Sequence, residues 1–257
     1  MQYIDTHSHY GHRLFNGDRD VLIKSLLSTN LQYIIECGTD VISNKKVIGL
    51  TEQYENVYGV IGFFPTNSAQ LASKTIYENF VSQLNLDKII GLGEIGLDYY
   101  HRGNPAEQKK WFIEQLKLAR RLNLPVCIHS RDAEQDTLSI LKNHGKNLGV
   151  IHCYAYGVKT MKELVKLGYY FGVGGTCTYK NNTELRNAIK EMPLDRIVLE
   201  TDCPFLTPDA VRRERNDSSK LLYVIKEIAK LKGIPEEDVI QATSENVKRL
   251  YPKMFKK

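Results

Sequence analysis

The 257-residue sequence has little of what marks membrane or secreted proteins. It contains no apolar stretch near the roughly 20 residues that cross a bilayer, and its start carries histidines in place of a basic leader followed by an apolar run. Its five cysteines are an odd number scattered along the chain, which favours reduced, mostly buried thiols over a disulfide framework. We therefore predict a cytoplasmic protein with no membrane partner.

The sequence also lacks Pro-, Gly- or Ser-rich linkers, low-complexity tracts and repeats that would divide it. With 42% hydrophobic and 25% charged residues, it has an ordinary globular composition and is long enough for a large core. The net charge of +5 is compatible with a polyanionic substrate but too small to establish one. We predict a single domain spanning residues 1–257, with no obligate protein partner.

Eight short runs rich in β-branched residues alternate with segments of helical periodicity. Because the runs are almost continuously apolar, both faces of each strand should be buried, as in a parallel sheet covered by helices. Eight such units in about 250 residues match the size of an α/β (β/α)8 TIM barrel. Two more helical segments over 217–250 would close the outer ring, including an extra C-terminal helix. The runs are residues 3–7, 33–38, 57–63, 89–96, 124–130, 149–153, 169–175 and 196–202.

Histidines and acidic residues interrupt these apolar runs near their C-terminal ends, which share one mouth in a TIM barrel. Each would be costly to bury alone, and a cation would supply the missing partner. Imidazole and carboxylate ligands suit Zn²⁺, Mg²⁺ or Mn²⁺. Six ligands are too many for one catalytic ion, so we predict two divalent ions. The predicted ligands are His7, His9, Glu94, His129, His152 and Asp202.

The first of these ligands belong to the stretch DTHSH, in which Asp5, His7 and His9 alternate. On a β-strand all three would point to one face and could converge on one object, although H-x-H pairs also occur in surface turns. For His12 and His144 we expect solvent-exposed or capping roles. For His101 such a role and a functional role are both open. Glu200 should point inward one layer below Asp202, in a hydrogen-bonded structural role.

Five segments in order, DTHSH, GEIGLDYY, IHSR, HCY and ETDCPFL, resemble the TatD family of metal-dependent deoxyribonucleases. The resemblance implies an amidohydrolase-like TIM barrel that hydrolyses phosphodiester bonds of DNA, often as a 3′–5′ exonuclease, and we expect a single-stranded substrate. It also implies that one ion is held by His7, His9 and Asp202 and the other by His129 and His152. Glu94 would bridge the ions, and Asp202 would help to activate the attacking water, so these two are the predicted catalytic residues.

Two segments bear on the substrate. The stretch PFLTPDAVRRERNDS places Arg212 and Asn216 where the family has an arginine and an asparagine, and Arg212 could contact phosphate or belong to a solvated basic loop. Phe64 stands where the family usually has a substrate-pocket histidine, and it could stack on a nucleobase. This departure keeps open the alternative of a metal-dependent hydrolase of a small ester, lactone, amide or phosphoester. A third interpretation is a structural metal site in a nucleic-acid-binding protein, although such sites are usually closed Cys/His tetrahedra.

Overall fold

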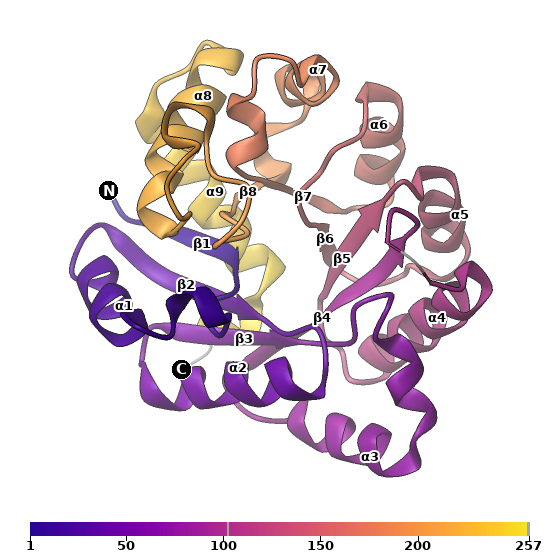
Figure 1. The fold of residues 1–257 in the computed structure, drawn as a ribbon. Helices are drawn as coiled ribbons and strands as arrows, with labels where there is room; N and C mark the ends of the chain where they lie inside the picture. The colour runs from indigo at the N-terminus through magenta and orange to yellow at the C-terminus, as the bar shows by residue number, and fades with distance from the viewer. Residues whose placement is uncertain (102, 256–257) are drawn as a thin grey trace.

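In the computed structural model, which describes residues 1–101 and 103–255, eight parallel strands form one sheet in the order β1 to β8 (Figure 1). The predicted (β/α)8 barrel is therefore confirmed. Most predicted runs differ from the strands by a few residues, but β6 and β8 are short and end before His152 and Asp202. The strands are β1 (Tyr3–Ser8), β2 (Leu31–Cys37), β3 (Val57–Ile61), β4 (Ile89–Asp98), β5 (Val126–Arg131), β6 (Gly149–Ile151), β7 (Tyr170–Val173) and β8 (Ile197–Leu199).

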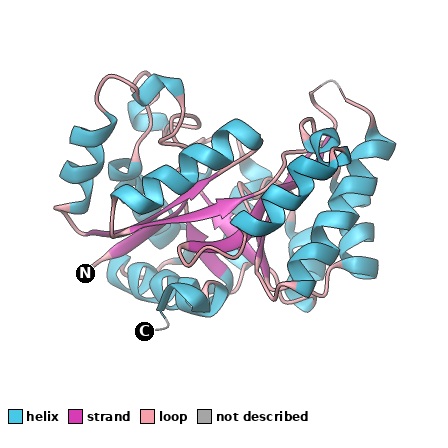
Figure 2. Cartoon of the chain, turned by 90° about the horizontal axis from the view of Figure 1, so that it is seen from below, coloured by secondary structure: helices cyan, strands magenta, loops and turns pink. Residues whose placement is uncertain are grey.

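A helix follows each strand and covers the outside of the barrel (Figure 2). Helix α4 shows why these segments are helical: the Asn104 side chain caps its N-terminus, Pro105 occupies the first turn, and Trp111 and Phe112 face the core. Among the described residues, no helix is long and apolar enough to cross a membrane. The eight are α1 (Arg19–Leu27), α2 (Val41–Gln53), α3 (Lys74–Gln83), α4 (Pro105–Arg121), α5 (Glu134–His144), α6 (Val158–Lys166), α7 (Thr183–Glu191) and α8 (Leu221–Lys232).

The barrel closes between its first and last strands. The His9 N–H donates to Cys203 O at 2.8 Å, and the Asp202 N–H donates to His7 O at 2.9 Å. These bonds join the ends of β1 and β8, so residues about 190 positions apart in sequence become neighbours at the mouth.

The extra C-terminal helix, α9 (Glu236–Leu250), covers the opposite end of the barrel (Figure 1, yellow). Side chains of α9 and of the turn after it pack against inward-facing strand residues, so the interior is a filled core. This inner cluster comprises Ile4, Ile35, Cys37, Val60, Ile90, Cys127, Val150, Tyr170 and Val198 from the strands, with Val247, Leu250, Tyr251 and Met254 from the C-terminal segment.

Candidate metal centre

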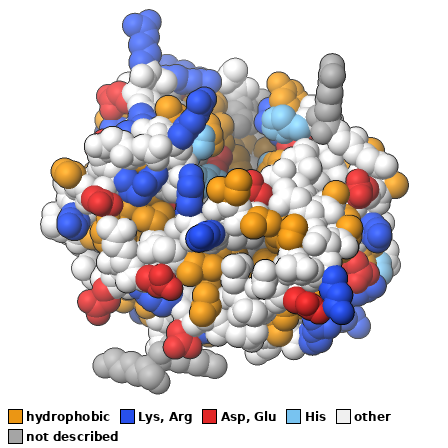
Figure 3. Space-filling model, turned by 60° about the horizontal axis from the view of Figure 1, so that its bottom comes forward, with side chains coloured by type: hydrophobic (Ala, Val, Ile, Leu, Met, Phe, Trp, Pro, Cys, Tyr) orange, Lys and Arg blue, Asp and Glu red, His pale blue; other side chains and the backbone are white. Residues whose placement is uncertain are grey.

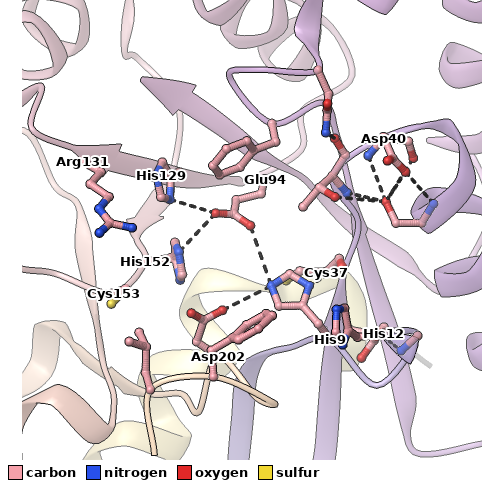
Figure 4. Close-up of a pocket in the computed structure, with 18 of the residues that line it drawn as sticks. His9, His12, Cys37, Asp40, Glu94, His129, Arg131, His152, Cys153 and Asp202 are labelled. Atoms are coloured by element: carbon pink, nitrogen blue, oxygen red, sulfur yellow. Dashed lines mark hydrogen bonds and ion pairs between the residues drawn. The ribbon is translucent and has the colours of Figure 1, made fainter. Parts of the chain in front are cut away.

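The structure brings the six predicted ligands together at the C-terminal mouth of the barrel (Figure 4). Three of them lie on strands, and the other three lie one to three residues after the end of a strand. The former are His7, Glu94 and His129, and the latter are His9, His152 and Asp202.

Three donor atoms and one oxygen of Glu94 form a first group. The Nε2 atoms of His7 and His9 lie 3.1 Å apart, and Asp202 Oδ1 lies 3.6 and 3.2 Å from them. Glu94 Oε2 lies 3.6 Å from His7 Nε2 and 3.8 Å from His9 Nε2. Tetrahedral ligands about 2.1 Å from a common ion are separated by about 3.4 Å, so this group has the spacing of a metal site.

A second group uses the other oxygen of the same carboxylate. Glu94 Oε1 lies 3.0 Å from His129 Nδ1 and 3.2 Å from His152 Nε2. Glu94 therefore directs one oxygen to each set of imidazoles, which is the arrangement that a bridging carboxylate requires.

The cluster places acidic and imidazole groups in a nearly dry environment. Burial alone would raise the pKa of Glu94, but His152, His129 and His7 outweigh it and hold that pKa well below its ordinary value. Burial lowers the pKa of His152, yet the charges of Glu94 and Glu200 raise it well above its ordinary value. The buried carboxylates thus need positive charge beside them, which protons or bound cations can provide.

The imidazoles present their second nitrogen to atoms behind the ring, and the hydrogen bonds that His9 and His129 make there fix their tautomers. His9 Nδ1 lies 2.9 Å from Cys37 O, His129 Nε2 lies 2.9 Å from Asp98 Oδ2, and His152 Nδ1 lies 3.4 Å from Glu200 Oε1. His7 differs from these three, because the atoms behind its Nδ1 are sulfurs.

Asp98 is a supporting residue that the sequence analysis missed. It accepts hydrogen bonds from the His101 N–H at 2.8 Å and pairs with His101 Nδ1 at 3.0 Å, in addition to its contact with His129. A signal was present, since Asp98 follows Glu94 by four positions on β4 and an even separation on a strand gives the same face. His101 therefore supports the centre through Asp98 and also lines the cavity.

Asp5 and Glu36 are buried carboxylates that support the end of β1. Asp5 accepts hydrogen bonds from Thr201 Oγ1 and Ser218 Oγ, both at 2.7 Å, so it lies below the centre and does not converge with His7 and His9. Glu36 accepts from the backbone N–H groups of Tyr10 and Gly11 at 2.8 and 2.7 Å, which fixes the turn after His9.

The remaining polar residues take places outside the two groups. His12 caps a short 3-10 helix by accepting from the Leu14 N–H, and His144 lies in the last turn of α5. Glu200 lies below the mouth, as expected, and accepts from the Cys153 N–H at 2.5 Å.

A cavity of about 900 Å³ opens over the cluster. Figure 3 shows histidines inside this hollow and Lys and Arg side chains on part of its rim. The lining includes the cationic residues Arg13, Lys46 and Arg131 and the aromatic residues Phe64 and Phe205. The Phe64 ring lies 4.6 Å from the His129 ring, and this places an apolar surface beside the second group.

The two residues predicted from the PFLTPDAVRRERNDS stretch have different surroundings. Arg212 has a half-exposed side chain that stacks over Tyr179 at 3.9 Å. Asn216 is fully buried and donates to Thr201 O at 2.9 Å and Phe205 O at 2.6 Å. In this structure both Asn216 hydrogen bonds are made within the protein, and its role in substrate binding stays a prediction. Its amide holds both ends of the loop carrying Asp202, whose backbone is left-handed at φ 57°.

A closed parallel barrel with buried His, Glu and Asp clusters at its C-terminal mouth is the architecture of metal-dependent hydrolases. The family model of TatD related DNases matches residues 4–252, and the chain belongs to this family. It is thus a TatD-family metal-dependent hydrolase.

Relatives of the chain match along nearly its whole length. YabD of Bacillus subtilis (strain 168), named an uncharacterized metal-dependent hydrolase, is 34% identical over 251 residues, covering 96% of this chain and 98% of the relative. The crystal structure of YjjV, a TatD homologue from Escherichia coli K12, aligns with a TM-score of 0.89 at 30% identity, covering 97% of this chain and 98% of that one. Human deoxyribonuclease TATDN3 is 29% identical over 269 residues, covering 98% of this chain and 95% of the relative.

Proposed function

We propose that the protein hydrolyses phosphodiester bonds of single-stranded DNA at a two-metal centre, as a 3′–5′ exodeoxyribonuclease. The observation that carries this proposal is the position of Glu94, whose two oxygens face two separate groups of nitrogen and oxygen donors. The family description and the name of the human relative agree with a nuclease.

In this proposal His7, His9 and Asp202 hold one divalent ion, His129 and His152 hold the other, and Glu94 bridges them. Mg²⁺, Mn²⁺ and Zn²⁺ are the candidate ions. Bound ions at such a centre supply a water of lowered pKa and neutralise charge on the phosphoryl oxygens.

The side chains around the centre have distinct tasks. Asp202 lies at the edge of the first group, with 17% of its side chain exposed, and accepts the proton of the attacking water. Arg13, Lys46 and Arg131 line the cavity and offer donors to backbone phosphates. Phe64, beside His129, provides a face on which a terminal nucleobase can stack.

Arg212 is proposed to guide the strand toward the mouth. Its guanidinium is held over Tyr179, and its Nη1 atom lies 3.4 Å from Asp209 Oδ1, a long contact that phosphate can replace. Asn216 supports the same region from inside, through the loop that carries Asp202.

The experiment is digestion of end-labelled single-stranded and duplex DNA by protein stripped of metal and reloaded with one ion at a time, with products separated at single-nucleotide length. We expect stepwise shortening from the 3′ end of single strands. The substitution Glu94→Gln keeps the size of the side chain and should abolish digestion, whereas Glu114→Gln, on the exposed side of α4, should not. Unchanged digestion by Glu94→Gln would overturn the proposal, as would hydrolysis of small esters or phosphoesters without any cleavage of DNA, which would favour the alternative substrate class.

A further inference from the structure

A sulfur-containing group of donor atoms lies directly behind His7, inside the barrel. The Nδ1 atom of His7 is 3.4 Å from Cys37 Sγ on β2 and 3.4 Å from Cys127 Sγ on β5. All three donor atoms lie within 4.8 Å of one another, and the three residues are at most 2% exposed. The Nε2 atom of the same ring faces His9, Glu94 and Asp202.

We propose that His7 Nδ1, Cys37 and Cys127 form a site for a thiophilic divalent ion such as Zn²⁺ or Cd²⁺, and that its occupation inhibits the enzyme. With Zn–S of about 2.3 Å and Zn–N of about 2.05 Å, tetrahedral geometry separates sulfur and nitrogen by about 3.5 Å. The observed 3.4 Å separations already match this spacing. Two thiolates and one imidazole are also donors that select soft over hard ions.

The charge of such a site suits its burial. Each thiol loses its proton when it coordinates, so one divalent ion enters and two protons leave to the solvent. The ion and two thiolates together carry no net charge, and the cost of an uncompensated charge in the barrel interior is avoided. Cys37 borders the mouth cavity, which gives the ion a route to the site.

His7 makes the sulfur site and the hydrolytic centre mutually exclusive. A neutral imidazole has one nitrogen lone pair for coordination, and its other nitrogen carries a proton. When Nδ1 coordinates an ion between the cysteines, Nε2 is protonated and is lost as a donor to the group with His9 and Asp202. The inhibitory effect rests on the proposed function, whereas binding of the ion does not.

Binding is tested with Co²⁺ added to the metal-free full-length protein. We expect a thiolate-to-cobalt charge-transfer band, a signal that a centre of nitrogen and oxygen donors cannot produce. Both Cys37→Val and Cys127→Val should remove the band. Cys177→Val and Cys153→Ala are the matched controls and should keep the band. Cys177 is as buried as Cys37 and Cys127 but is not part of the sulfur site, and Cys153 is the thiol beside His152.

Inhibition is tested by titrating Cd²⁺ into the nuclease assay with Mn²⁺ present. Half-inhibition should require about tenfold or more Cd²⁺ in Cys37→Val and Cys127→Val than in the wild type, a loss typical of altered metal surroundings. Each variant is compared with its own uninhibited rate. If valine is too large for the barrel interior, Cys37→Ala and Cys127→Ala replace the valine variants.

Absence of the charge-transfer band in the wild type would overturn the proposed site, and so would its persistence in both valine variants. Equal Cd²⁺ sensitivity of all variants would overturn the inhibitory role. If no nuclease activity is found, the Co²⁺ spectrum still decides whether the ion binds, so the two proposals can fail separately.

Discussion

Replacement of Asn216 by alanine should damage stability and metal binding together. The side chain is fully buried and donates two hydrogen bonds, to Thr201 O at 2.9 Å and Phe205 O at 2.6 Å. A hydrogen bond contributes about 1 kcal/mol net, and an orphaned buried acceptor costs about 1–3 kcal/mol. We therefore expect Asn216→Ala to lower the free energy of unfolding by about 2–5 kcal/mol. The freed loop carries Asp202, so the affinity for Mn²⁺ should fall as well.

Asn246 offers a matched control for this experiment. It is also fully buried and donates to two backbone carbonyls, Leu194 O at 2.9 Å and Ile197 O at 2.7 Å, but it lies on α9 at the opposite end of the barrel. Urea unfolding should give similar losses for Asn246→Ala and Asn216→Ala, whereas calorimetric titration with Mn²⁺ should show weakened binding only in Asn216→Ala. Equal Mn²⁺ affinities in the two variants would refute the positioning role of Asn216.

Two further outcomes follow from side chains away from the loop. Asp98→Asn should weaken the affinity for Mn²⁺ about 10–100-fold, because His129 loses its hydrogen-bond partner. Calorimetry measures this affinity, and Asp136→Asn on α5 is the control that should leave it unchanged. Equal affinities of the two variants would argue against a supporting role of Asp98. Burial and the hydrogen bond to Asp20 raise the pKa of Tyr54 from 10.0 to about 12. The stability that the protonated Tyr54 hydroxyl gives the folded state is therefore present below pH 10 and is lost as the pH rises toward 12. Urea unfolding should therefore show the stability advantage of the wild type over Tyr54→Phe shrinking across that window, and a constant difference would contradict this reasoning.

The fold was predictable because most strands are almost continuously apolar and the segments between them have apolar residues at helical spacing. The ends of strands were less predictable, since β6 and β8 stop at Ile151 and Leu199 although the predicted runs extend to residues 153 and 202. There the chain turns at the mouth, and Cys153 and Asp202 both adopt positive φ angles. Such backbone changes depend on tertiary contacts such as those of Glu200 and Asn216, which short-range patterns do not encode.

The six candidate ligands could be located because each interrupts an apolar run, and the structure brings them together. Supporting residues were harder to recognise. Asp98 is the last residue of β4, next to a loop where a charged side chain is unremarkable, and Asn216 lies in a stretch rich in charged residues that suggests an exposed loop. What sequence could not reveal is that Asn216 is fully buried although its neighbours in the stretch are charged.

The C-terminal segment has a consequence for how the molecule is made. Tyr251 and Met254 pack against strand residues that begin with Ile4, so the floor of the barrel is supplied by residues that are synthesised after all eight strands. While these residues are still within the ribosome, the strands already made have an uncovered apolar interior. The packed interior is therefore completed only when helix α9 and the turn at Pro252–Phe255 dock against the strands.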